Sequence, residues 1–305
     1  MSLRVLVLGG SGFIGSYLVE ALVDLGAQVR VLSRHAGIHT PPLPGVNYHF
    51  ADFTDLASVS ESLFDVDIVF HLISSTVPAT ANLNPIADIN GNLLPTVKLL
   101  QMMCDMGVPR LIFLSSGGTV YGNVKSVPIS ETQGRNPLSS YGIVKAAIED
   151  YILMFSSQHG LKSLVLRVSN PYGPRQNRIG IQGVIPTFFK QIMSGEEIRI
   201  WGDGSSIRDY LYISDLIAVI LRFASTDVSG VFNVGSGQGT SLSEVLSTIE
   251  NVTGTAANVK FLPSRGFDVD KVVLDITKLR ETLHWSPIVS LREGCCRYWD
   301  HAKSI

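Results

Sequence analysis

The chain has 305 residues, of which 45% are hydrophobic and 16% charged, and its formal net charge is −2. This composition predicts a soluble globular protein with one large core or two modest ones, and it argues against disorder and against nucleic acid as a partner. No apolar run approaches the roughly 18 residues of a membrane span, and no signal-peptide pattern is present, so we expect a cytoplasmic protein with no membrane partner. The three cysteines make neither a disulfide framework nor a metal site.

The first fifteen residues have the pattern strand, glycine turn, helix. The apolar run Leu3–Leu8 ends at a turn with glycines at positions 9, 12 and 15, and helical spacing of apolar residues continues over Ser16–Leu25. Such glycines permit a tight turn, close approach to a pyrophosphate and tight helix packing, while the helix N-terminus offers N–H groups. An ordinary strand-to-helix turn is the alternative. The pattern predicts a dinucleotide site formed by Gly9, Gly12, Phe13, Ile14 and Gly15.

The second predicted strand, Gln28–Leu32, is followed by Ser33 and Arg34. Dinucleotide-binding folds usually place an acidic residue here to bind the ribose hydroxyls, whereas an arginine suits a 2′-phosphate. These two residues therefore favour NADP over NAD. The alternative is that Arg34 is a solvated loop charge and that Ser33 accommodates NAD.

A third strand is predicted at Val46–Phe50, and two residues follow it closely. Asp52 is the candidate for binding the adenine amino group, with Phe53 beside the ring. The alternative for Asp52 is a cap on the helix that begins near Asp55.

The remaining N-terminal elements complete the alternating pattern. Strands are predicted at Asp67–Leu72 and Leu111–Leu114, with a long helix over about residues 92–106 between them. Strands that alternate with helices predict an α/β fold with a doubly wound parallel sheet of the Rossmann type. Ligands of such sheets lie at the carboxyl ends of the strands.

Tyr141 and Lys145 lie four residues apart on a predicted helix that opens at Ser139. A phenol titrates near pH ~10, so it acts as a base at neutral pH only when nearby positive charges stabilise its phenolate. Lys145 supplies one such charge and a bound nicotinamide ring the other. A chance pair on an exposed helix is the alternative, but the serine pair Ser115–Ser116 and the glycine turn favour an acid–base site.

These motifs, with Asn92 and Thr96 and the segment 167–174, resemble the extended short-chain dehydrogenase/reductase family, and within it the nucleotide-sugar epimerases typified by UDP-glucose 4-epimerase. The resemblance covers nearly the whole chain. It implies a dinucleotide-binding domain over 1–170 and a smaller α/β substrate domain over 171–305, with some segments returning to the first. It also implies a homodimer formed through helices at 92–106 and 139–157.

The resemblance further implies a role for each matched residue of the first domain. Tyr141 is the catalytic base, Lys145 assists it and bonds the nicotinamide ribose, and Ser116 bonds the sugar O4. The family's commoner pattern has one residue fewer between the serine pair and Thr119, because here two glycines follow the pair. Ser115 and Thr119 are therefore the alternatives to Ser116 for this contact. The other cofactor contacts are Asn92, which braces the cofactor and the active-site helix, and Leu72, in a segment that departs from the usual Ala-rich turn.

The C-terminal third carries the residues that the resemblance assigns to a UDP-linked substrate, namely Asn170, Val184, Arg208, Arg265, Asp268 and Val272. Arg208 and Arg265 are expected to clamp a diphosphate from separate loops, with surface ion pairs as the alternative. Val272 is small enough to leave room for a 2-acetamido group. N-acetylhexosamines are therefore expected as substrates besides simple hexoses.

The segment 117–120 carries no carboxylate, although the dehydratases and some decarboxylases of the family place an acid there. Elimination is therefore disfavoured, and the favoured reaction is 4-epimerisation of a UDP-hexose or UDP-N-acetylhexosamine through a 4-keto intermediate. The alternative is an NADPH-dependent 4-keto reductase of a nucleotide-activated 6-deoxyhexose, which Ser33, Arg34 and the unusual segment 71–75 support. A non-catalytic nucleotide sensor is a third hypothesis.

Overall fold

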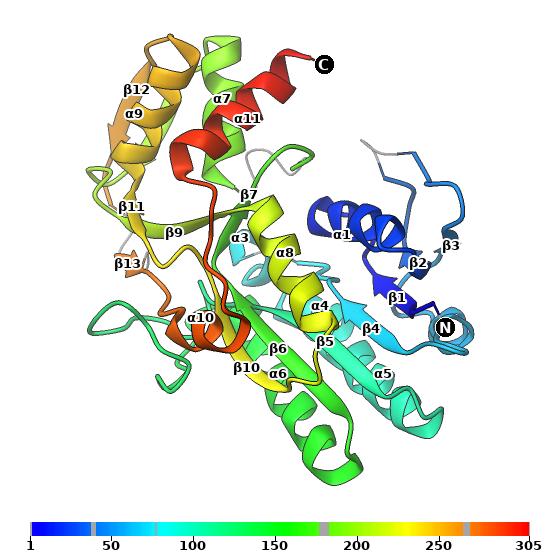
Figure 1. The fold of residues 1–305 in the computed structure, drawn as a ribbon. Coiled ribbons are helices and arrows are strands. Elements are labelled where there is room, and N and C mark those ends of the chain that lie inside the picture. Colours follow the sequence, from blue (N-terminus) through cyan, green and yellow to red (C-terminus); the bar gives the residue numbers. More distant parts are fainter. Residues whose placement is uncertain (1, 38–40, 77, 177–182, 265–268, 305) are drawn as a thin grey trace. The chain divides into compact units, whose positions relative to one another are not determined.

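The structure is a computed structural model that describes residues 2–37, 41–76, 78–176, 183–264 and 269–304 (Figure 1). The chain divides into two compact units. The first comprises residues 1–120, 137–167 and 217–232, and the second comprises 121–136, 168–216 and 233–305. The chain therefore crosses between the units several times, and residues 217–232 lie in the first unit although they follow residue 170.

The first unit is built on a seven-stranded sheet in the order β10-β6-β5-β4-β1-β2-β3. Its strands are β1 (Arg4–Leu8), β2 (Gln28–Ser33), β3 (Asn47–Phe50), β4 (Ile68–His71), β5 (Arg110–Ser116), β6 (Lys162–Val168) and β10 (Gly230–Val234). Strand β1 pairs in parallel with both β2 and β4, so the order reverses beside β1. The predicted doubly wound α/β sheet is confirmed. Sheets of this type generally bind ligands at the carboxyl ends of their strands.

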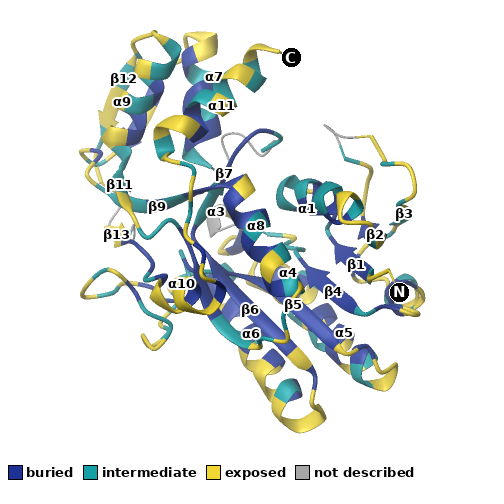
Figure 2. Cartoon of the chain, viewed as in Figure 1, coloured by how far each residue is buried: buried dark blue, intermediate teal, exposed yellow. Residues whose placement is uncertain are grey.

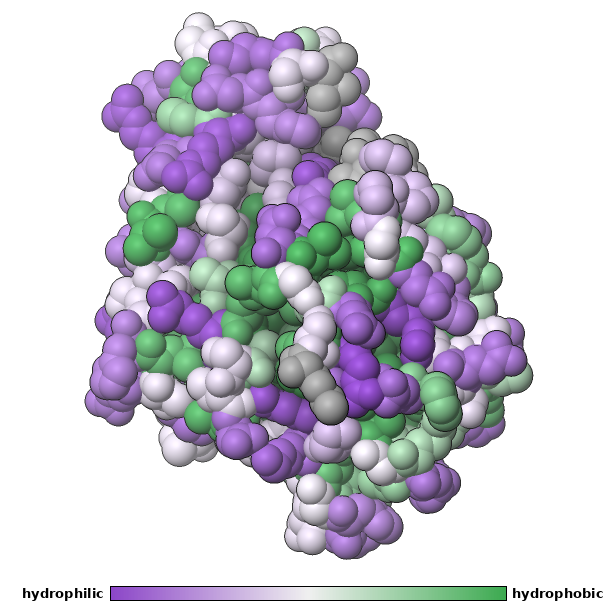
Figure 3. Space-filling view, turned by 45° about the vertical axis from the view of Figure 1, so that its right-hand side comes forward, coloured by the Kyte–Doolittle hydropathy of each residue, from purple (hydrophilic) through white to green (hydrophobic). Residues whose placement is uncertain are grey.

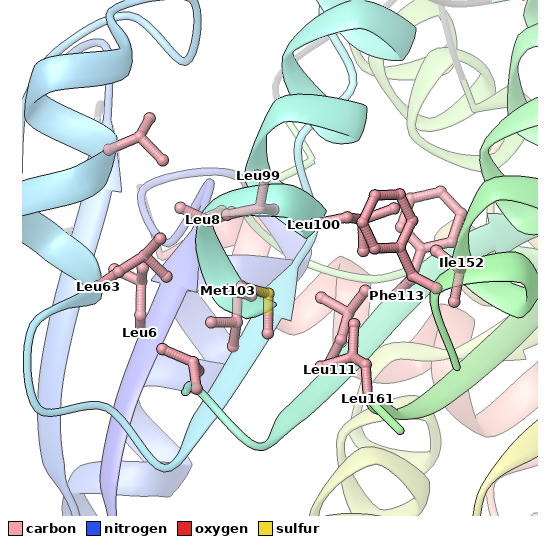
Figure 4. Packing of buried hydrophobic residues seen from close by; sticks show 14 of the residues in the cluster. Leu6, Leu8, Leu63, Leu99, Leu100, Met103, Leu111, Phe113, Ile152 and Leu161 are labelled. Carbon is pink, nitrogen blue, oxygen red and sulfur yellow. The ribbon is translucent and has the colours of Figure 1, made fainter. Parts of the chain in front are cut away.

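The helices associated with this sheet are α1 (Phe13–Asp24), α2 (Leu56–Leu63), α3 (Pro78–Ala81), α4 (Pro85–Asp88), the π-helix η1 (Ile89–Leu93), α5 (Leu94–Asp105), α6 (Ser140–His159) and α8 (Ile213–Ala224). Leu99, Leu100 and Met103 of α5 pack with Leu6 and Phe113 of the sheet (Figure 4). Strands β1, β4, β5 and β6 are buried nearly throughout (Figure 2), as expected of parallel strands that helices cover on both faces, whereas the edge strand β3 has no buried residue.

Local sequence signals set several helix ends. Asp55 caps α2, accepting hydrogen bonds from the backbone N–H groups of residues 57 and 58, so the cap considered for Asp52 belongs to Asp55. Ser139 caps α6, and Gly160, with φ +71°, ends it. The predicted helix at 92–106 is instead a π-helix followed by α5, and Pro95 lies in the first turn of α5, where its missing N–H is tolerated.

The second unit holds the elements β7 (Asn170–Tyr172), α7 (Val184–Ser194), β8 (Ile198–Trp201), β9 (Ile207–Tyr212), β11 (Gly239–Ser241), α9 (Leu242–Thr253), β12 (Val259–Leu262), β13 (Lys271–Val272), α10 (Thr277–Leu283) and α11 (Leu291–Lys303). Strand β9 pairs with β7, β11 and β13, while β8 pairs with β12. The buried Asp209 carboxylate accepts hydrogen bonds from Ser236, Gly237 and Leu274 and so joins three segments of this unit.

The surface is mixed in character. Figure 3 shows hydrophilic residues (purple) beside apolar ones (green) on one face of the molecule. Within the described ranges, no helix is both long and apolar enough to cross a membrane.

Candidate active site

The glycine turn after β1 depends on glycine at two of its three predicted positions. Gly9 has φ +86°, in the region that favours glycine, and a Cβ on Gly15 would overlap the Gly9 carbonyl oxygen. Gly12 is different, because a Cβ there would meet only the Gly9 oxygen, at 3.3 Å. It is the N-cap of α1 and supplies no side-chain cap, so the unpaired N–H groups of the first turn suit a diphosphate.

The carboxyl end of β2 holds the residues expected to choose between NAD and NADP. Ser33 is 7% exposed, and its hydroxyl oxygen accepts a hydrogen bond from the backbone N–H of Ser11, at 3.1 Å. Arg34 and Asp52 are both exposed. Hydrogen bonds from Thr54 lower the pKa of Asp52, and the Arg34 guanidinium lowers it further. Arg34 and Asp52 therefore interact electrostatically beside this edge.

The Phe53 ring, which we expected beside an adenine, packs instead in the core. Phe53 is 4% exposed, and its ring centre lies 5.0 Å from that of His71 in an edge-on contact. Since the side chain fills the core, any contact between Phe53 and an adenine is left to its backbone.

His71 at the end of β4 is a buried, neutral histidine. Its Nε2 lies 2.9 Å from the Thr96 hydroxyl oxygen, and that hydroxyl donates its hydrogen to the Asn92 carbonyl. Nε2 therefore carries the ring hydrogen that Thr96 accepts. Burial, and secondarily the Lys145 charge, lower the pKa of His71 to about 3.

This burial predicts a pH-dependent stability. In the unfolded chain His71 titrates near pH ~6.5, so its contribution is fully present above that pH and is lost as the pH falls toward 3. The free energy of unfolding should fall between pH 8 and pH 5 in both the wild-type protein and the variant His71→Asn. Because only the wild type has this histidine, its fall should be larger by about 2 kcal/mol, by linkage. Urea unfolding of both proteins at the two pH values measures this, and equal losses would contradict it.

The helix α6 brings Tyr141 and Lys145 together. The Lys145 Nζ lies 5.9 Å from the centre of the Tyr141 ring, and it donates a hydrogen bond of 2.9 Å to the Leu114 carbonyl. It also lies 4.6 Å from the centre of the Phe113 ring. Burial lowers the pKa of Lys145 to about 8, although Glu149 and Asp88 oppose this shift. The Lys145 ammonium is therefore fixed beside Tyr141 in a largely dry environment.

The two serines at the end of β5 have different environments. Ser115 is 6% exposed and donates its hydroxyl hydrogen to Glu149. The Ser115 hydroxyl hydrogen is therefore already used in the core, which favours Ser116 over Ser115 for the predicted sugar contact. Ser116 is half-buried, and its carbonyl accepts from the backbone N–H groups of Thr119 and Val120.

The turn after Ser116 lies directly against the first turn of α6. A Cβ on Gly142 would come within 2.8 Å of the Thr119 carbonyl oxygen, so this approach depends on the glycine. The Thr119 hydroxyl oxygen is buried without a hydrogen-bond partner among the residues that the structure describes. Thr119 consequently remains a candidate for a polar ligand contact next to Tyr141.

Asn92 is held in the π-helix η1, and its side chain braces the loop after β4. Its Oδ1 accepts a hydrogen bond from the Ser75 N–H at 2.8 Å, and its Nδ2 donates to the Asp88 carbonyl at 3.2 Å. These contacts join Asn92 to the loop after β4 and to α4, and its predicted bracing of the cofactor and of the active-site helix stays a prediction.

Ser115, Ser116 and Thr119 lie in the first unit, and the other predicted substrate residues that the structure describes lie in the second. The Arg208 guanidinium donates to the Ile207 carbonyl at 2.9 Å, and Val272, 2% exposed, pairs with Arg208 across β13 and β9. Asn170 donates its amide to the Asp209 carbonyl at 3.0 Å, and Val184 begins α7. Arg265 and Asp268 lie outside the described residues.

A family model for the NAD dependent epimerase/dehydratase family matches residues 5–235. The chain belongs to this family. It is therefore an enzyme of the group of NAD-dependent epimerases and dehydratases that act on nucleotide sugars.

Three similar proteins illustrate the range of this family. The UDP-glucose 4-epimerase of Thermotoga maritima, solved with UDP-glucose, is 35% identical with a TM-score of 0.92, and 99% of each chain is covered. The UDP-glucose 4-epimerase of Thermus thermophilus, solved with NAD, is 33% identical with a TM-score of 0.91, again with 99% of each chain covered. The dTDP-4-dehydro-6-deoxyglucose reductase of Escherichia coli is 33% identical over 95% of this chain and 94% of its own.

Sequence reasoning missed two buried carboxylates beside the predicted pair, Asp88 and Glu149, both 0% exposed. Glu149 forms an ion pair with Arg167, whose NH2 lies 2.7 Å from its Oε2. One available signal was the four-residue spacing from Tyr141 to Lys145 and on to Glu149, which places all three on one face of α6. Asp88 has the same four-residue spacing to Asn92, but its contacts with Thr76 and Ser140 are brought about only by the fold.

Proposed function

We propose that this enzyme is a nucleotide-sugar 4-epimerase that acts on a UDP-hexose or a UDP-N-acetylhexosamine. The observation that carries the proposal is the fixed Tyr141–Lys145 pair on α6, packed against the turn that follows Ser116. The segment 117–120 in this turn has no carboxylate that could promote elimination. Hydride removal and return at C4 is the reaction that this set of groups supports best.

The residues have distinct roles in the proposed reaction. Tyr141 takes the proton of the C4 hydroxyl and later returns it, and the Lys145 ammonium stabilises the phenolate by electrostatic attraction. Ser116 donates a hydrogen bond to the sugar O4. NAD, when bound, supplies reversible hydride transfer at C4. Rotation of the resulting 4-keto sugar exposes its other face, so return of the hydride inverts C4.

The cofactor and the substrate would be held by separate groups. The open N-terminus of α1 at Gly12 would bind the dinucleotide diphosphate, while Arg208 on β9 would bind the substrate diphosphate. Val272, next to Arg208 in the paired strands, has a small side chain, and this supports the inclusion of N-acetylhexosamines among the proposed substrates. UDP-galactose and UDP-N-acetylgalactosamine are therefore the first two substrates to test.

A 4-keto reductase is the second candidate, favoured by Ser33 and Arg34 at the carboxyl end of β2. Denaturing the purified enzyme and identifying any released dinucleotide separates the two. Stoichiometric NAD supports the epimerase, because its cofactor is regenerated in each turnover. Empty enzyme that consumes NADPH with a 4-keto sugar overturns it. In that case Arg34→Ala should weaken NADPH binding about tenfold and leave NADH binding unchanged.

We also infer that the enzyme is a homodimer formed through α5 and α6. These helices contact each other, and they expose apolar side chains such as Leu94, Ile143 and Leu153. Burying such a face against a second copy is favourable because it removes apolar area from water. Light scattering that finds only monomers at micromolar concentration would contradict this.

A further inference from the structure

The carboxylate of Asp88 joins three segments of the first unit. Its Oδ1 accepts hydrogen bonds from the Thr76 hydroxyl at 2.7 Å and the Asn92 amide at 2.9 Å, and its Oδ2 accepts from the Ser140 hydroxyl at 2.8 Å. Asp88 is 0% exposed. A buried carboxylate is costly unless its oxygens are hydrogen-bonded, and here both oxygens are.

Each of the three segments contains or contacts part of the candidate active site. Thr76 lies in the loop after β4, at the ligand-binding edge of the sheet, and Asn92 braces the same loop through Ser75. A Cβ on Gly91 would come within 2.7 Å of the Ser75 hydroxyl oxygen, so η1 packs closely against this loop. Ser140 immediately precedes Tyr141.

The first turn of α6 needs such an anchor. The first four N–H groups of a helix have no partner within the helix, so helix ends fray more readily than the middle. Here the Ser139 side chain accepts from Gly142, the Ser140 N–H donates to the Asn82 Oδ1 at 2.8 Å, and the Ser140 hydroxyl donates to Asp88. Of these three contacts, only that of Asp88 also reaches η1 and the loop after β4.

We propose that Asp88 is a positioning residue that fixes the first turn of α6, and with it Tyr141, against the loop after β4. Its role as an aid to turnover rests on the proposed function, but the anchoring itself does not. Misplacement of a catalytic group by about 1 Å can reduce a rate by ~100-fold. Loss of the anchor should therefore reduce kcat and leave the KM for the nucleotide sugar nearly unchanged.

The experiment compares Asp88→Ala, Ser140→Ala and the double variant with Asn84→Ala. Asn84 caps the same short helix α4 but has no contact with α6 among those that the structure gives, so it is the matched control. Both single variants should reduce kcat for UDP-galactose by roughly 10- to 100-fold, with KM changed less than threefold. The double variant should be no slower than Asp88→Ala, because both changes remove the same link.

Asp88→Asn separates the charge of Asp88 from its hydrogen bonds. Its amide oxygen can face Thr76 and Asn92 and its NH2 can face Ser140, so kcat should recover to within about fivefold of wild type. The charged groups around Lys145 are Glu149, paired with Arg167, and Asp88, while His71 is neutral. The negative charge of Asp88 raises the pKa of Lys145, so Asp88→Asn should lower that pKa. If the alkaline limb of the pH–rate profile reports loss of the Lys145 proton, it should move to lower pH in this variant.

Hydrogen exchange supplies a readout that needs no substrate. Amides of residues 141–146 should exchange at least tenfold faster in Asp88→Ala and Ser140→Ala than in wild type and Asn84→Ala. Unchanged exchange, or full kcat in Ser140→Ala, would overturn the anchor. If the wild-type enzyme acts on neither proposed UDP-sugar, the proposed function fails, and exchange still decides whether Asp88 holds α6.

Discussion

Tyr141→Phe should reduce kcat by about 10²- to 10⁴-fold, the usual contribution of a positioned acid–base group. The phenyl ring keeps the packing of the first turn of α6, but it lacks the hydroxyl that would exchange a proton with the sugar. Lys145, whose Nζ lies 5.9 Å from the ring centre, would then face a ring that cannot ionise. Turnover of UDP-galactose, followed by chromatography of the nucleotide sugars, measures the effect.

Tyr151→Phe is the matched control for that experiment. Tyr151 lies on the same helix and is 39% exposed, so removing its hydroxyl should leave kcat within about twofold of wild type. Both variants should bind NADH with wild-type affinity in a fluorescence titration. Activity of Tyr141→Phe within threefold of wild type would mean that another group moves the proton.

Glu149→Ala should reduce the free energy of unfolding by about 3 to 5 kcal/mol, the usual cost of leaving one partner of a buried ion pair alone. The side chain of Glu149 is fully buried and that of Arg167 is 6% exposed. The Arg167 Nε donates to the two Glu149 carboxylate oxygens at 3.2 and 3.1 Å, and its NH2 donates to Oε2 at 2.7 Å. The variant also leaves the Ser115 hydroxyl without its acceptor. Urea unfolding monitored by circular dichroism measures the loss.

Asp227→Ala provides the comparison, because Asp227 pairs with Lys162 at 2.7 Å while their side chains are 86% and 53% exposed. Exposed pairs contribute little, so this variant should lose far less unfolding free energy than Glu149→Ala. A loss of similar size in both variants would show that burial does not set the value of the Glu149–Arg167 pair.

The sequence by itself determined the sheet and the outline of the site. These features are visible in the sequence because each follows from a local requirement. The turn needs glycine at position 9, where φ is +86°, and a strand such as β4 that is buried on both faces needs a continuous apolar run. The pair at Tyr141 and Lys145 was also visible, because a four-residue spacing places two side chains on one helical face whatever surrounds them.

Only the tertiary structure decided which polar groups are buried and what they contact. Ser115 and Ser116 are adjacent and chemically identical, yet one is bound to Glu149 inside the core and the other is half-buried at the end of the strand. Asp88 reaches Ser140, 52 positions later in the chain, and the sequence carries no trace of that contact. Long-range hydrogen bonds depend on how the elements pack, and no local pattern encodes them.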